Sequence, residues 1–214
     1  MNHLVARRQE EKERRRGEIL DAAEAVAGAV GIDAMTMDQV ARKARLSRAL
    51  LYVYFQDKAD LMFGLCNRAL DILQQRFSGA VLRHKEGLRQ VEACGRSYVA
   101  FAQEFPVYFE ALAKFEAHSF DPTAEAGNEG ACVLAGDRVH AVLIGAIERG
   151  VRDGSIRPDA GPPPLVSFTL WAFMHGVIQL ASTKAALLAH DGVTAQQLVD
   201  QALLQSVRSL AQPG

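Results

Sequence analysis

The side chains best suited to a chemical task lie within residues 36–61. Between Asp38 and Asp57 the segment has no acid, but it has four cations and then two tyrosines: Arg42, Lys43, Arg45, Arg48, Tyr52 and Tyr54. Guanidinium, ammonium and phenol groups donate hydrogen bonds to phosphate oxygens, and an arginine can also bind a guanine edge with two parallel bonds. The segment is therefore suited to a DNA major groove. A solvated cationic face would show the same charges.

Helix-capping signals place these side chains on two short helices joined by a tight turn. The run from Thr36 to Gln39 fits a capping box and predicts a helix through about residue 44. Ser47 is a good N-cap for a second helix over about residues 48–54. Asp57 and Asp60 resemble the cap of a further helix that runs toward residue 82. Short helix pairs also occur in proteins that never touch DNA, so the pattern alone leaves both interpretations open.

The rest of the chain predicts an all-α fold of about nine helices. From residue 10 to residue 30 the apolar residues recur at the 3.6-residue period of an amphipathic helix, and Gly31 follows as a C-cap. No alternating strand pattern is found. Further helices are predicted over about residues 86–104, 106–118, 131–153, 165–189 and 194–210. The run from Ser119 to Gly130 is predicted as a loop, and the Gly-Pro-Pro-Pro run at 161–164 as a break.

Charge and composition narrow the class of protein. The net charge is −1, but residues 1–58 hold 11 Lys/Arg against 9 Asp/Glu, so only the first part of the chain is basic. No signal peptide is evident. Polar residues interrupt the most apolar stretch, 165–190, which favours a buried helix over a membrane span. The three cysteines have no zinc-site spacing: Cys66, Cys94 and Cys132. We therefore expect a cytoplasmic protein that makes no membrane contact.

The order of residues from about 16 to 62 resembles the DNA-binding domain of TetR-family transcriptional regulators. The shared marks run without a break through the segment: Ile19, Leu20, Ala22, Ala23, Gly31, Thr36, Val40, Ala41, Ala44, Leu46, Ser47, Leu51, Tyr52, Phe55 and Lys58. The resemblance implies an N-terminal three-helix helix-turn-helix domain with a basic arm over residues 1–62. It also implies a C-terminal helical domain for effector binding and dimerisation over residues 63–214.

Eight residues are expected to contact DNA. Thr36 and Ser47 would offer hydroxyls and helix N-termini to phosphates, and Arg48 would reach a guanine edge or a phosphate. Ala49 is small enough to lie against the methyl group of a thymine. Lys58 resembles the phosphate-clamping lysine of the family. The full set is Thr36, Arg45, Ser47, Arg48, Ala49, Tyr52, Tyr54 and Lys58.

Two residues depart from the family pattern, and both departures affect which operator sequence we expect the protein to bind. Arg45 stands at a turn position that needs positive φ and usually holds glycine, so we expect about 1 kcal/mol of strain there. Leu50 stands where the family commonly has a hydroxyl residue, which removes one polar contact.

Six cations mixed with acids precede the first core turn: Arg7, Arg8, Lys12, Arg14, Arg15 and Arg16. They predict either a solvated helical extension with ion pairs one turn apart or an arm that places arginine in the minor groove.

Aromatic residues gather in the C-terminal part of the chain. Each one alone fits core packing, but together with histidines in helical phase they could line an apolar effector pocket with a few polar groups. The stretch from Trp171 to Gly176 is similar to a Trp-x-x-x-His-Gly pattern of one TetR subgroup. No pair of histidines has metal-ligand spacing, so we expect no metal. The candidate pocket residues are Phe105, Tyr108, Phe109, Phe115, His118, His140, Trp171 and His175.

The resulting expectation is a homodimeric repressor that a small, partly apolar effector releases from a palindromic double-stranded operator. The resemblance implies that the last two helices form the dimer. The alternatives are an all-α DNA-binding protein without an effector, or a small all-α carrier or enzyme. No nucleophile–base pair or cofactor loop is found, so we expect neither enzymatic activity nor a cofactor.

Overall fold

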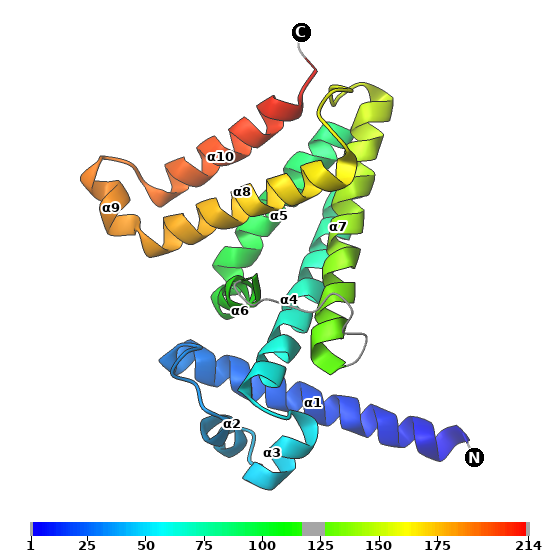
Figure 1. The fold of residues 1–214 in the computed structure, drawn as a ribbon, viewed down its shortest axis with the longest axis vertical. Helices are drawn as coiled ribbons and strands as arrows, with labels where there is room; N and C mark the ends of the chain where they lie inside the picture. Colours follow the sequence, from blue (N-terminus) through cyan, green and yellow to red (C-terminus); the bar gives the residue numbers. More distant parts are fainter. Residues whose placement is uncertain (1, 117–126, 213–214) are drawn as a thin grey trace. The chain divides into compact units, whose positions relative to one another are not determined.

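A computed structural model describes residues 2–116 and 127–212, and the regular elements in those ranges are helices (Figure 1). The all-α prediction is confirmed. One isolated antiparallel bridge joins Ile156 to Ala211. The ten helices are α1 (Asn2–Val30), α2 (Met37–Lys43), α3 (Arg48–Tyr54), α4 (Lys58–Val81), α5 (Gly87–Glu104), α6 (Pro106–Glu116), α7 (Gly127–Asp153), α8 (Pro163–Thr183), α9 (Ala185–His190) and α10 (Ala195–Leu210).

The predicted helix over residues 165–189 is two helices in the structure, and the tenth helix results from this break. Lys184 leaves the helical conformation at φ −118° and ψ 24° between α8 and α9. Just before it, the hydroxyl of Thr183 donates to the carbonyl of Gln179 at 2.7 Å. Hydroxyl groups that bond to the preceding turn compete with helical pairing, and such bonds often bend helices. At the other end, prolines occupy the first helical positions of α8, where no backbone donor is needed.

The predicted loop over 119–130 is wrong for residues 127–130, which already belong to α7. Asn128 explains the early start, because its side chain is held by the neighbouring helices. Its amide accepts a bond from Arg16 at 2.6 Å and donates to the carboxylate of Asp60 at 2.6 Å. Asn67 donates to its backbone carbonyl at 3.0 Å. Residues 119–126, and also His118 from the predicted pocket, lie outside the described residues.

The chain divides into two compact units. The first contains residues 1–69 and 105–133, and the second contains residues 70–104 and 134–214. The whole segment 1–62 therefore belongs to the first unit, together with α6 and the beginning of α7. The boundary at residue 62 as the limit of a functional domain stays a prediction.

The first unit is built around the apolar faces of α1 to α4. Its fully buried side chains include Ile19, Val40, Leu51, Phe55 and Leu65. Each of the four helices provides one of these residues and Phe55 directly follows α3, so burial of their side chains fixes how α3 packs on the rest of the unit. The exposed face of α3 is positioned by this small core.

The second unit includes a close helix crossing that requires glycine. A Cβ atom on Gly87 of α5 would lie 2.0 Å from the backbone nitrogen of Gly150 in α7, which no side chain tolerates. Ile156 fills the space beside Gly150 and is fully buried. In the same unit α10 packs against α5 and α8.

Two helices, α7 and α8, are long and apolar enough to span a membrane when judged by length and composition alone. In the structure 39% and 33% of their most apolar windows are buried. Core helices of soluble proteins meet the same criteria, so this observation carries little weight by itself.

Candidate nucleic-acid interface

The predicted capping box opens α2. The backbone N–H of Gln39 donates to the hydroxyl of Thr36 at 3.3 Å, and the backbone N–H of Thr36 donates to the side chain of Gln39 at 2.8 Å. Met37 and Val40 turn into the core, whereas Thr36 and Asp38 remain exposed. The hydroxyl of Thr36 thus lies at an exposed helix N-terminus, where a phosphate oxygen can bind.

The turn between α2 and α3 has the predicted left-handed residue. Arg45 has φ 56°, and it is the one non-glycine residue with positive φ in the described chain. Around it, the N–H of Leu46 donates to the carbonyl of Ala41 at 2.9 Å, which closes the C-terminus of α2. This conformation costs an arginine about 1 kcal/mol. The Arg45 side chain is exposed and lies beside the start of α3.

Ser47 caps α3 as predicted, because its hydroxyl accepts the N–H of Leu50 at 3.2 Å. Leu51 is the buried anchor of this helix. Five of its other side chains are exposed, from residue 48 to 50 and at 52 and 53, and Arg48, Ala49 and Tyr52 share one outward surface. A short helix that exposes a cation, a small side chain and a phenol near its N-terminus has the form of a major-groove recognition helix.

Arg48 is held by two neighbours in the structure. Its Nη1 donates to Oδ2 of Asp38 at 3.3 Å, and its Nε lies 3.3 Å from Oδ1 of the same carboxylate. Its guanidinium also lies 5.5 Å from the ring centroid of Tyr52, one helical turn further along α3. The side chain that is best suited to reading a base is therefore already oriented.

Lys58 and Tyr54 are half-buried and are tied to the same unit. The ammonium of Lys58 donates to the backbone carbonyl of Asp33 at 2.8 Å, and it keeps further N–H donors for a phosphate. The carboxylate of Asp33 accepts two bonds from Lys114 of α6 at 2.6 Å, and these hold the pKa of Asp33 below its usual value. Tyr54 accepts a bond from Arg16 at its backbone carbonyl.

Two residues of this surface were not among the predicted contacts. Val53 is the most exposed apolar side chain of α3, at 73%. It lies four residues after Ala49, so helical periodicity could have placed it on the same face. Asp38 could not have been found in this way, because its approach to Arg48 depends on how the turn folds.

The pocket residues predicted in α6 and directly before it make contacts within the first unit. Tyr108 is buried, and its hydroxyl donates to the carboxylate of Glu24 in α1 at 2.6 Å. Burial, together with this hydrogen bond, raises the pKa of Tyr108. The ring of Phe105 lies 6.0 Å from that of Tyr108, and Phe115 contacts Phe63 edge-on. Phe109 is buried as well.

The pocket residues predicted in the second unit make two sets of contacts. His140 of α7 lies 2.8 Å from the hydroxyl of Ser167 and 5.2 Å, between ring centroids, from Trp171 of α8. Burial lowers the pKa of His140. His175 instead contacts the hydroxyl of Tyr98 in α5 at 2.6 Å, and burial lowers its pKa to about 4. The structure thus brings His140 and Trp171 together and gives His175 a different partner.

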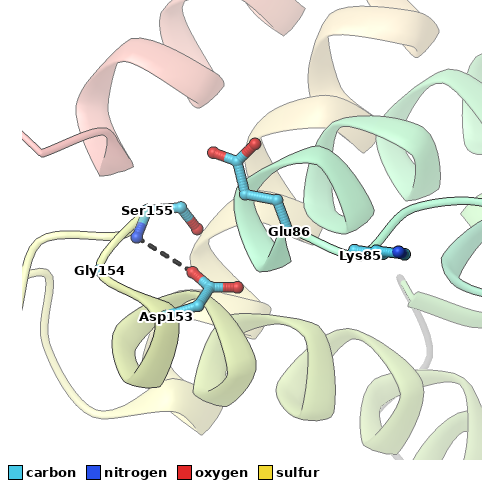
Figure 2. Close-up of a pocket in the computed structure, with 5 residues that line it drawn as sticks. All are labelled: Lys85, Glu86, Asp153, Gly154 and Ser155. Carbon is cyan, nitrogen blue, oxygen red and sulfur yellow. Dashed lines mark hydrogen bonds between the residues drawn. The ribbon is translucent and has the colours of Figure 1, made fainter.

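An open depression of about 420 Å³ in the second unit is lined by residues outside the predicted pocket (Figure 2). The side chains of Asp153 and Ser155 there accept the backbone N–H groups of Gly87 and Leu88, at 2.9 and 3.0 Å, and so cap α5. These bonds explain the polar groups of the depression as helix capping. Its lining residues are Lys85, Glu86, Asp153, Gly154 and Ser155.

The geometry defines an all-helical protein with a helix-turn-helix that exposes a cationic recognition helix. The family of bacterial regulatory proteins called tetR matches residues 19–65, and a tetracyclin repressor-like C-terminal domain matches residues 91–205. The second match alone covers more than half of the chain. The protein therefore belongs to the TetR family of DNA-binding transcriptional regulators, which are not enzymes.

Individual relatives agree with this assignment. The chain is 37% identical over 76 residues to the HTH-type transcriptional regulator HbdR of Aromatoleum sp. (strain CIB), a match that covers 36% of this chain and 31% of HbdR. It thus spans about a third of that relative.

Three examples illustrate the solved structures that share the fold. A protein of unknown function from Rhodococcus sp. RHA1 has a TM-score of 0.72 and 23% identity over 92% of this chain and 95% of its own. The ketosteroid transcriptional regulator KstR2 of Mycobacterium tuberculosis has a TM-score of 0.66 and 20% identity, over 93% of this chain and 96% of its own. AibR in complex with isovaleryl coenzyme A and operator DNA has a TM-score of 0.64 and 17% identity, over 89% of this chain and 97% of its own. At these identities the similarity concerns the fold alone.

Proposed function

We propose that this regulator is a cytoplasmic homodimeric repressor that binds a palindromic operator through α3 and leaves it when a small effector binds. The observation that carries the proposal is the exposed surface of α3, where Ser47, Arg48, Ala49 and Tyr52 follow a closed turn. The family assignment supplies the class of regulator. The residue roles, the dimer and the effector belong to the proposal.

In the proposed complex the contacts fall into two groups. Thr36, Ser47, Tyr54 and Lys58 bind phosphates and set the register of the protein on the duplex, which carries little sequence information. Arg45 and Tyr52 are also assigned to the DNA backbone. The polar group of Arg45 lies beside the start of α3, and that of Tyr52 lies on the exposed face of this helix. Base recognition is assigned to Arg48, through a guanine edge, and to Ala49, through a thymine methyl.

The proposed dimer rests on a stripe along α8. Its exposed positions recur every three or four residues, so they form one face of the helix. Leu165, Phe168, Phe173 and Leu180 lie on this face and are 41–62% exposed, with the small residues Ala172 and Gly176 between them. The exposed face of α10 is mostly polar but includes Leu204. An apolar face of this length is suited to the same face of a second copy.

For the effector we propose a partly apolar small molecule. The candidate polar groups in the second unit are His140 and His175, and the aromatic ones are Trp171 and its neighbour Phe168. AibR was solved with isovaleryl coenzyme A, so acyl-coenzyme A thioesters are the first compounds to try. His118 and the aromatics of α6 stay in the proposal as candidates.

Signal transfer to DNA can follow α4 and α6. Residues 58–69 of α4 belong to the first unit and residues 70–81 to the second, so a displacement of this helix reaches both. In the first unit α6 is bound to the DNA-binding segment through the Tyr108–Glu24 bond and the Lys114–Asp33 ion pair. An effector lowers DNA affinity only as far as it prefers the arrangement that does not bind the operator.

Selection of bound DNA from a random library tests the proposal. We expect a palindrome with half-sites separated by about one helical turn or a multiple of it. The variant Ala49→Glu keeps α3 helical but adds a carboxylate to its DNA-facing surface, so it should recover no site. The matched control is the same substitution at the exposed Ala185 of α9, which should recover the wild-type site. Recovery of no palindrome by the unmodified chain would contradict the proposal.

The effector is tested on the recovered operator. Isovaleryl coenzyme A should raise the dissociation constant of the protein–operator complex, and free coenzyme A should not. If a panel of acyl thioesters and ketosteroids leaves operator affinity unchanged, the protein is instead a DNA-binding regulator that responds to neither class.

A further inference from the structure

We propose that Asp38 is a specificity-determining residue that positions the guanidinium of Arg48 for reading a base. The inference rests on the proposed role of Arg48 as the base-reading side chain. Asp38 lies in the first turn of α2, ten residues before Arg48, and its side chain reaches across the turn to the recognition helix. It would act on DNA only through Arg48.

The geometry of the pair leaves the useful edge of Arg48 available. A guanidinium has five N–H donors, and the carboxylate of Asp38 faces Nε and one N–H of Nη1. Nη1 has a second N–H, and Nη2 takes part in neither of these two contacts. A parallel pair of donors, one from each terminal nitrogen, is what O6 and N7 of guanine accept.

Tyr52 limits the motion of Arg48 on a second side. Its ring lies one helical turn away, 5.5 Å from the guanidinium carbon, which is within the range of a cation–π contact. A free arginine samples many rotamers and loses that freedom when it binds a base. Asp38 and Tyr52 already restrict the rotamers of Arg48 in the free protein. The side chain therefore loses less conformational entropy when it binds the correct base, which favours that binding.

The pair contributes little to folding. The side chains of Arg48 and Asp38 are 65% and 54% exposed, and exposed ion pairs stabilise proteins only slightly. Loss of Asp38 should therefore leave thermal stability almost unchanged. An effect on base discrimination without an effect on stability is what separates positioning from a structural role.

A simpler alternative is that Asp38 only repels the DNA backbone. In that case removal of its charge would raise affinity for every sequence by the same factor. A positioning role instead predicts an effect at the base pairs that Arg48 reads and at no others. The two explanations therefore predict different changes of affinity across the base pairs of the operator.

The experiment compares wild type, Arg48→Ala, Asp38→Asn and the double variant on the selected operator and on every single base-pair change in one half-site. Dissociation constants are measured at one salt concentration. We expect Arg48→Ala to lower discrimination by about 10- to 100-fold at one or two base pairs. Asp38→Asn should lower it by about 3- to 10-fold at the same base pairs, because the arginine is present but no longer oriented. In the Arg48→Ala background, Asp38→Asn should have no further effect there.

The control removes the same charge elsewhere. Asp191→Asn, at the exposed end of α9, should leave the discrimination profile unchanged. A uniform change of affinity in Asp38→Asn, or an equal effect of that substitution with and without Arg48, would overturn the inference. If Arg48→Ala itself leaves base discrimination unchanged, the proposed role of Arg48 fails first. The two failures can thus be told apart.

Discussion

At the scale of single residues, the neighbours of a polar group decide what it can do. Tyr108 illustrates this, because its hydroxyl was a candidate for contact with an effector and in the structure donates to Glu24. Lys58 likewise donates to a backbone carbonyl while it keeps other donors for a phosphate. His175 is the more perturbed of the two candidate histidines that the structure describes, since burial lowers its pKa to about 4.

The buried His175 should make stability depend on pH. The folded chain resists protonation of this ring until about pH 4, whereas the unfolded chain takes up the proton near pH 6.5. Its contribution to stability is therefore present above about pH 6.5 and is lost as the pH falls toward 4. A depression of this size corresponds to about 3 kcal/mol.

Urea unfolding at pH 7.5 and 4.5 checks this expectation. The variant His175→Gln cannot titrate and should lose much less unfolding free energy between the two pH values than wild type. The exposed His190 of α9 provides the control, and His190→Gln should follow the wild-type pH dependence. Equal pH dependence in wild type and His175→Gln would show that this histidine is not the titrating group.

At the scale of the element, α1 has two parts with different surroundings. From Arg16 onward it contacts other helices of the first unit, since the Arg16 guanidinium donates to Asn128 and lies 4.7 Å from the ring centroid of Phe55. Residues 5–14 are exposed, and Arg14 forms ion pairs with Glu11 and Glu18. The structure thus agrees with a helical, ion-paired extension, while contact of the arm with DNA stays a prediction.

Deletion of residues 2–13 tests the arm. Because the removed segment is exposed, the free energy of unfolding should change by less than about 1 kcal/mol. Operator affinity and its salt dependence should also stay unchanged if the segment is only a solvated helix. The variant with Arg7, Arg8 and Lys12 replaced by glutamine keeps the helix length and serves as the comparison. A shallower salt slope in both variants would place the arm on DNA.

At the scale of the whole molecule, the two halves carry different tasks. The first unit holds the helix-turn-helix, and the second holds the long apolar helix α8 with its exposed stripe. In the proposed complex an operator with two half-sites requires two copies of α3, so the DNA affinity of the first unit depends on the proposed dimer of the second. The dimer is therefore the property of the whole molecule that most needs a test.

The variant Leu180→Glu should dissociate the proposed dimer. Leu180 is 44% exposed on the α8 stripe, and a carboxylate buried against a second copy would lack a partner. Sedimentation at micromolar concentration should give a monomer, and operator affinity should fall with it. Leu82 is 86% exposed after the end of α4, so Leu82→Glu makes the same chemical change outside the stripe and should remain dimeric. A Leu180→Glu dimer would exclude this face as the interface.

The sequence by itself determined the features that depend on neighbours within about four residues. The capping box at Thr36 and the cap at Ser47 were predictable, because each is a contact within one turn of chain. The left-handed Arg45 was predicted from the resemblance to the family, in which glycine usually holds this turn position. The family pattern extended these local signals to a helix-turn-helix of known order, and the long helices followed from apolar periodicity.

Only the tertiary structure decided which distant side chains meet. The pairs Arg48–Asp38 and Tyr108–Glu24, and the bonds that hold Asn128, join residues from different helices, so their formation depends on crossing angles set by the buried core. The predicted pocket residues of α6 belong to the first unit and those of α7 and α8 to the second, a division that helical periodicity does not reveal. Helical periodicity fixes the face on which a residue lies, but the packing of that face fixes its partner.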